Sequence, residues 1–200
     1  MKHLRIVLAP LLVFVLATAA SAERLSLAAI SDYLNSLTSA EAEFTQVNDD
    51  GTISTGRIFI NRPGRIRFEY NPPDASLVMA GSGEVVIFDN KSNATPERFP
   101  LASTPLAIIL KPTVNLGQAR MVVGHTSDAT TTTVTAQDPD HPEYGNIQLV
   151  FTDNPVELRQ WIVTDAADQQ TTVILGELKT GGTLSPRMFD IRGELEKRGF

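Results

Sequence analysis

The feature that most constrains the fold of this chain is a long succession of short runs in which apolar and polar residues alternate. A period of two is typical of strands that bury one face of a sheet and expose the other. About ten or eleven such runs follow one another after residue 40, separated by segments rich in Gly, Pro, Asp and Asn. Consecutive strands joined by short turns predict an antiparallel meander, and a sheet of this many strands tends to curl or to split in two.

Two other segments predict helices. Residues 25–37 carry apolar side chains three or four positions apart, and Ser26 is a suitable N-cap. Residues 103–112 contain Pro105, a favourable first helical residue, and are apolar on nearly all sides, so a helix there must be buried or cover an apolar surface. If the sheet curls without closing, these two helices are available to cover its concave face. The residues expected to belong to this cover are Leu27, Ile30 and Leu34 in the first helix and Leu106, Ile109 and Leu110 in the second.

The N-terminal residues predict export from the cytoplasm. A short basic start, an apolar run and the small residues Ala20-Ser21-Ala22 are the three parts of a secretory signal peptide. We therefore expect residues 1–22 to be cleaved off and residues 23–200 to form one domain. The sequence contains no cysteine, so neither a disulfide nor a cysteine-linked lipid anchor is expected.

Composition and motifs argue against several function classes. The formal net charge of −6 argues against nucleic acid and against anionic membrane surfaces as partners. Beyond the signal the chain has two histidines, His125 and His141, and no serine in a nucleophile elbow, so neither an enzyme nor a cofactor is expected. Residues 138–144, DPDHPEY, combine carboxylates with an imidazole but match no specific metal-loop spacing, and an exposed turn is favoured over a metal site. A hydrolase or metal protein that uses His141 is the alternative from another class.

Large apolar side chains recur on one face of successive strands. This face is either the core of a two-sheet sandwich or the lining of an apolar cavity, formed by one curled sheet and covered by the helices. Periodicity alone does not separate the two interpretations. The residues predicted to share the face are Ile58, Ile60, Ile66, Phe68, Leu77, Met79, Leu149, Phe151 and Ile162.

An arginine ends the first of these apolar rows. Strand parity places Arg62 on the face of Ile58 and Ile60, directly before Pro63. Strand-end arginines usually reach water. These residues alone therefore favour an outward-facing side chain over a functional one.

Several short motifs occur in an order that resembles the LolA family of outer-membrane lipoprotein carriers. They are EFTQV at 43–47, the block from Gly56 to Tyr70 with its R-P-G sequence, TPLAIIL, L-R-Q-W at 158–161 and Phe189. The resemblance implies an α+β fold, an unclosed antiparallel half-barrel of about eleven strands with a helical lid over a hydrophobic cavity.

The resemblance also implies a function, that of a periplasmic chaperone without enzyme activity that acts as a monomer. Such a carrier takes a triacylated lipoprotein from an inner-membrane ABC transporter of the LolCDE type, shields its acyl chains and passes it to an outer-membrane receptor of the LolB type. Arg62 matches the arginine of the family's R-P motif, and its implied role is a latch that binds polar groups of the lid helices while the lid is closed. The tail at 190–200 lacks the Pro-rich ending common in the family, so no role is implied for it. The alternative is a periplasmic carrier or sensor of lipids or of another acylated ligand that uses the same cavity.

Overall fold

The computed structural model describes residues 24–90, 94–118 and 120–200, and its strands form a single antiparallel sheet. The strands are β1 (Ser39–Val47), β2 (Ile53–Asn61), β3 (Arg65–Tyr70), β4 (Leu77–Gly81), β5 (Glu84–Phe88), β6 (Glu97–Pro100), β7 (Val122–Ser127), β8 (Thr131–Gln137), β9 (Asn146–Asp153), β10 (Val156–Thr164), β11 (Gln170–Leu175) and β12 (Lys179–Thr180). Their order is β6-β5-β4-β3-β2-β1-β11-β10-β9-β8-β7, and β12 pairs with β1 beside this path. The predicted signal peptide lies outside the described residues.

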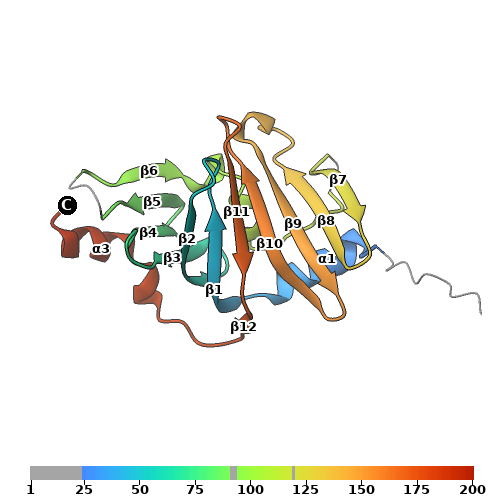
Figure 1. Cartoon of the computed structure of the whole chain (residues 1–200), viewed down its shortest axis with the longest axis horizontal. Coiled ribbons are helices and arrows are strands. Elements are labelled where there is room, and N and C mark those ends of the chain that lie inside the picture. The colour runs from blue at the N-terminus through green and yellow to red at the C-terminus, as the bar shows by residue number, and fades with distance from the viewer. Residues whose placement is uncertain (1–23, 91–93, 119) are drawn as a thin grey trace, which may run out of the picture.

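The sheet curls without closing. Neighbouring strands are consecutive in the chain except at the centre, where β1 pairs with β11. The two ends of the described sheet, β6 and β7, are edges that do not pair with each other. Figure 1 shows β4 to β6 lying across the direction of β9 to β11, as expected of a strongly twisted sheet. The predicted antiparallel meander and unclosed half-barrel are confirmed, and the two-sheet sandwich is wrong because both halves belong to one sheet.

Short helices accompany the sheet in the described part of the chain: α1 (Leu27–Ser36), η1 (Leu101–Ser103), α2 (Ala107–Leu110), η2 (Pro142–Tyr144), η3 (Pro186–Phe189) and α3 (Ile191–Arg198). α1 begins as predicted, because the Ser26 hydroxyl accepts a hydrogen bond of 3.1 Å from the Ala29 amide. α2 is shorter than the predicted helix, since Pro105 lies in the turn before it. Among the described residues, no helix combines the length and the apolar character needed to cross a membrane.

The main apolar cluster lies on the concave face of the sheet, and α1 packs on that side against β10 (Figure 1). The curled sheet contributes inward-facing side chains from both of its halves, which is why one continuous cluster forms. Six of the nine residues predicted to share this face belong to the cluster, and they are Ile58, Ile60, Ile66, Phe68, Leu149 and Phe151.

Leu77 and Met79 do not face the concave side, which corrects the sequence prediction. In the register of β3 and β4, Ile66 is opposite Ala80 and Phe68 is opposite Val78, so Leu77 and Met79 point to the outer face. There they form a second, separate cluster with residues of β5 and of the C-terminal helix α3. Alternation cannot show which residues of β4 point inward, because this strand is apolar on both of its faces. Its outer face is apolar because α3 packs against it. The second cluster comprises Leu77, Met79, Val86, Phe88 and Ile191, with Leu195 packed against it.

Ile162 also faces outward, contrary to prediction. A register shift between Leu158 and Gln160 in β10 inserts an extra residue, so Leu158 and Trp161 both point to the concave side. Ile162 then lies opposite Gln148 on the outer face and is partly exposed. A bulge reverses strand parity beyond it, and simple alternation cannot anticipate this.

Candidate ligand cavity and its cover

Three pieces of chain cover the concave face: α1, α2 and residues 111–116, which we call the strap. The strap leads away from the end of α2, and two of its side chains are buried in the main cluster, with Val114 2% exposed and Leu116 1% exposed. Of the predicted cover residues, Ile30, Leu34, Ile109 and Leu110 are buried in the same cluster, and Leu27 and Leu106 are partly buried against it. In this closed arrangement the space over the concave face is occupied by the cover's own side chains.

Arg62 joins the sheet to the beginning of the strap. Its guanidinium Nη2 donates a hydrogen bond of 2.7 Å to the carbonyl oxygen of Lys111, the C-cap residue directly after α2. Such carbonyls lack partners within the helix and are good acceptors for arginine. Desolvation by burial lowers the pKa of Arg62, and its Nε is buried without a hydrogen-bond partner in the described part of the chain. The one hydrogen bond to Lys111 therefore compensates only part of the free energy that burial of the guanidinium costs. The interpretation in which Arg62 points outward into water is wrong.

Polar side chains of α1 hold the other end of the strap. The Asn35 amide makes a two-way contact with Val114, donating to its carbonyl at 2.9 Å and accepting from its amide at 2.8 Å. The Ser31 hydroxyl accepts from the Leu116 amide at 3.0 Å and donates to the carbonyl of Leu27 at 2.7 Å. Apart from the bond to Leu27, which lies within α1, these bonds and that of Arg62 join a side chain to strap backbone. The strap is thus held by these polar contacts and by the burial of Val114 and Leu116, and not by a strand ladder.

α1 itself is tied directly to the sheet. The Leu158 amide, which lies at the bulge in β10, donates to the Tyr33 hydroxyl at 3.1 Å, and the Tyr33 ring packs edge-on against Phe151 at 5.8 Å between centroids. Burial raises the pKa of Tyr33. Just before the helix, the Leu25 amide donates to the Thr132 hydroxyl at 3.0 Å. α1 is therefore attached to the sheet itself, whereas the strap is attached to α1 at one end and to Arg62 at the other.

The motif residues around Gly56 form an aromatic wall within the main apolar cluster. Gly56 lies between Phe44 on β1 and Tyr70 on β3, and the two rings meet edge to face at 5.2 Å. A Cβ on Gly56 would lie 2.8 Å from the Phe44 ring and 2.1 Å from the Glu69 carbonyl oxygen, so only glycine fits. The Tyr70 hydroxyl donates to Gln46 at 2.7 Å, and burial raises the pKa of Tyr70 to about 12.

Sequence reasoning missed part of the site. Phe44 and Trp161 were not assigned to the cavity although both are buried, and Phe68 joins them through edge-to-face contacts at 5.5 and 6.3 Å. The signal for Phe44 was available, because it shares its strand face with Ala42. Simple alternation from Leu158 places Trp161 on the outer face, and only the bulge turns it to the concave side. The strap carried no periodic signal that could have marked it.

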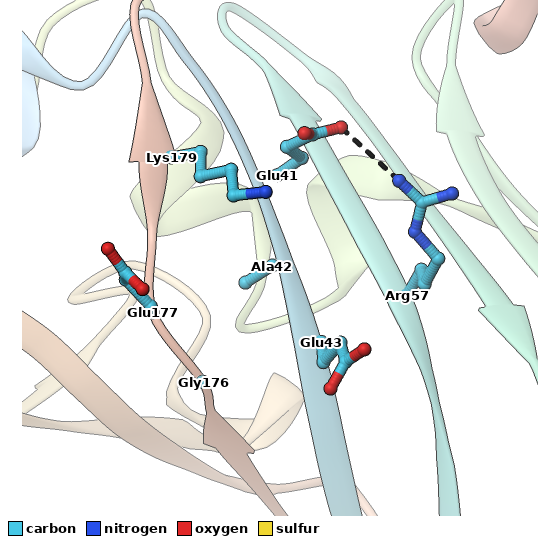
Figure 2. Close-up of a pocket in the computed structure, with 7 residues that line it drawn as sticks. All are labelled: Glu41, Ala42, Glu43, Arg57, Gly176, Glu177 and Lys179. Carbon is cyan, nitrogen blue, oxygen red and sulfur yellow. Dashed lines mark hydrogen bonds and ion pairs between the residues drawn. The ribbon is translucent and has the colours of Figure 1, made fainter.

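A different pocket, of about 400 Å³, lies on the outer face of the sheet at β1 and is lined by charged residues of both signs. Figure 2 shows Glu41 pointing toward Arg57, with a separation of 3.4 Å, while Lys179 extends from β12 toward β1. Glu43 and Glu177 also line it. Charged walls in contact with water suit polar groups and disfavour an acyl chain, so this pocket is not the candidate site.

The turn that holds His141 is exposed. Its Nδ1 lies 2.9 Å from a carboxylate oxygen of Glu143, which raises the pKa of His141, and its ring stacks on Tyr144 at 4.8 Å. Within the described residues, no group of three or more His, Cys, Asp or Glu side chains is placed to hold a metal ion.

Comparison with known proteins matches the sequence of this chain to a family. Residues 35–192 match the model of the family described as outer membrane lipoprotein carrier protein LolA. An outer-membrane lipoprotein carrier protein of Coxiella burnetii is 25% identical over 174 residues, which cover 82% of this chain and 81% of that protein. One of Methylococcus capsulatus is 25% identical over 179 residues, covering 86% of this chain and 85% of that protein. A crystal structure of a LolA superfamily protein from Nitrosomonas europaea aligns with a TM-score of 0.44 and 9% identity, over 84% of this chain and 99% of that one.

Proposed function

Because this chain belongs to the LolA family, we propose that it is a periplasmic lipoprotein carrier whose cargo site is the space beneath α1, α2 and the strap. In this proposal the acyl chains of the lipoprotein replace the side chains that the cover places over the concave face. No covalent chemistry is needed, and the protein acts as a chaperone, not an enzyme.

The observation that carries the proposal is an apolar concave face covered by α2 and the strap, which no strand ladder among the described residues joins to the sheet and whose backbone accepts or donates a few hydrogen bonds. Burial of an acyl chain is worth about 0.8 kcal/mol per methylene, so the carrier must offer apolar area comparable to that of a bilayer. The Ile, Leu and Met side chains of the interior suit chains of different length because flexible aliphatic groups can re-pack. Opening of α2 and the strap provides the way in.

Arg62 has the role of a latch in this proposal. While the strap is closed, the Lys111 carbonyl accepts one hydrogen bond from the half-buried guanidinium. Cargo that lifts α2 and the strap breaks this bond, and a buried unpaired guanidinium is costly. Re-formation of the bond therefore favours the closed, empty state and assists release of the cargo.

The partners follow from the same proposal. The carrier receives a triacylated lipoprotein from an inner-membrane ABC transporter of the LolCDE type. It crosses the periplasm as a monomer and delivers the lipoprotein to an outer-membrane receptor of the LolB type. A carrier or sensor of other lipids or acylated ligands would use the same interior.

The test is to isolate the protein from the periplasm of its own cells and to analyse its cargo by mass spectrometry, then to deplete it and fractionate the membranes. We expect bound lipoprotein, and after depletion we expect outer-membrane lipoproteins to be retained in the inner membrane. Bound free lipid combined with normal lipoprotein localisation would instead support the lipid carrier or sensor. Protein isolated without any acylated molecule, with lipoproteins still sorted normally, would refute both.

A further inference from the structure

A second apolar feature lies beside α2, at the rim of the half-barrel. It is a groove of about 740 Å³ between α2, η1 and the turns that join β2 to β3 and β4 to β5. The residues that line it are Pro63, Gly64, Arg65, Ser82, Gly83, Leu101, Ala102, Ala107, Leu110, Lys111, Pro112 and Asp138.

The floor of the groove is continuous with the interior. Leu101 and Leu110 line the groove and are also members of the main apolar cluster, in which they are 8% and 2% exposed. Ala107 lines the groove as well and packs against the same cluster. One layer of α2 side chains therefore separates the groove from the proposed cargo site.

The groove also touches the residues that close the cover. Lys111 and Pro112 are the first two residues of the strap, and the Lys111 carbonyl is the acceptor for Arg62. Next to Lys111, the Leu110 carbonyl accepts a hydrogen bond of 2.8 Å from the Gly64 amide. A molecule that settles in the groove thus lies against the contacts that must break for α2 to move.

The polar groups of the groove suit one kind of ligand. The Lys111 ammonium has no hydrogen-bond or ion-pair partner among the described residues, whereas Arg65 donates to the Asn61 carbonyl and one Asp138 carboxylate oxygen accepts from the Asp140 amide. A free ammonium beside an apolar floor matches a chain that ends in a hydrogen-bond acceptor, such as an ester or amide carbonyl.

The geometry points to this groove as the entry site for an acyl chain. The first acyl chain to arrive lies on Leu101, Ala107 and Leu110, and its carbonyl oxygen accepts a hydrogen bond from the Lys111 ammonium. When the strap is released, this acyl chain passes under α2 into the interior. This inference rests on the proposed carrier function, because it supplies the route to the same cargo site.

The experiment uses a synthetic triacylated lipopeptide with a photoreactive diazirine in one acyl chain. Peptide mapping after illumination at early times is expected to find label on groove residues of the wild-type protein, and at later times on the interior. In stopped-flow binding, Ala102→Trp is expected to slow association about tenfold while changing the equilibrium affinity much less, because the exposed Ala102 lines the groove and not the final site.

A matched control is Ala166→Trp, which adds the same side chain at an exposed turn far along the chain and should leave association unchanged. Lys111→Met is a second test variant, and it should also slow association. Unchanged association in both groove variants, with label confined to the interior, would overturn the entry site while leaving the carrier function intact. Failure of the wild-type protein to bind the lipopeptide at all would overturn both.

Discussion

Replacement of Asn35 by alanine should loosen the strap by a calculable amount. The Asn35 amide makes two neutral hydrogen bonds with the backbone of Val114, at 2.9 and 2.8 Å. Each such bond contributes about 0.5–1.5 kcal/mol net, so the closed strap should lose about 2 kcal/mol relative to the open one. At about 1.4 kcal/mol per factor of ten, the open population should rise about 30-fold.

The assay is native-state hydrogen exchange at the Leu116 amide. That amide donates to Ser31, so the Asn35→Ala substitution leaves its own partner in place and its exchange reports opening of the strap. We expect its exchange to accelerate about 30-fold, while amides in the centre of β9 change only as far as global stability changes. In the proposed carrier, ligand binds only when the strap is open, so apparent affinity for an acylated ligand should rise by up to the same factor.

Asn115→Ala is the matched control for this prediction. The Asn115 side chain accepts a hydrogen bond of 3.0 Å from the Gly117 amide and does not tie the strap to α1. Its removal should alter Leu116 exchange by less than about threefold. If Asn35→Ala behaves like Asn115→Ala, with the fold intact, then the two hydrogen bonds of Asn35 do not hold the strap closed.

Three further predictions concern the latch, the cavity wall and pH. Arg62→Leu removes one hydrogen bond from a charged donor, worth about 1.5–3 kcal/mol, so transfer of bound lipoprotein to outer-membrane vesicles should slow at least about tenfold, whereas Arg57→Leu on the outer face should transfer normally. Fast transfer by the Arg62 variant would exclude the latch. Ile60→Glu should impair release of lipoprotein from inner-membrane vesicles because Ile60 is 3% exposed on the concave face, while Ile162→Glu on the outer face should be tolerated. Equal loading of these two variants would contradict the assigned faces. Burial raises the pKa of Tyr70 from 10.0 to about 12, so its neutral form stabilises the fold fully below pH 10, and this contribution is lost as pH rises toward 12. Denaturant titrations should show the free energy of unfolding falling by on the order of 3 kcal/mol more in the wild type than in Tyr70→Phe over that range.

The sequence was sufficient for most of the fold because its signal is local. Alternation along β2 and β3 placed Ile58, Ile60, Ile66 and Phe68 on one face, and the spacing of Ile30 and Leu34 placed α1 against an apolar surface. Turn residues between consecutive runs predicted antiparallel neighbours. Each of these inferences depends on residues a few positions apart in one strand or helix. Which of those residues share a face does not depend on the rest of the fold.

The parity of individual strands needed the tertiary structure. Leu77 and Met79 belong to a strand that is apolar on both faces, and only the docking of α3 on the outer one decides where they point. Ile162 follows a bulge in β10 that reverses its face. Both depend on partners distant in sequence, so no local period could reveal them.

The sequence alone determined an alternating meander, two apolar helices and an arginine at the end of an apolar row. Only the tertiary structure brought Arg62 to the Lys111 carbonyl, 49 residues away, and Asn35 to Val114, 79 residues away. These contacts end on backbone atoms, which every residue carries. The types of side chain in the strap therefore do not indicate that the contacts exist. The physical reason is that hydrogen bonds to backbone atoms depend on where the chain passes, and that path is set by the curl of the whole sheet.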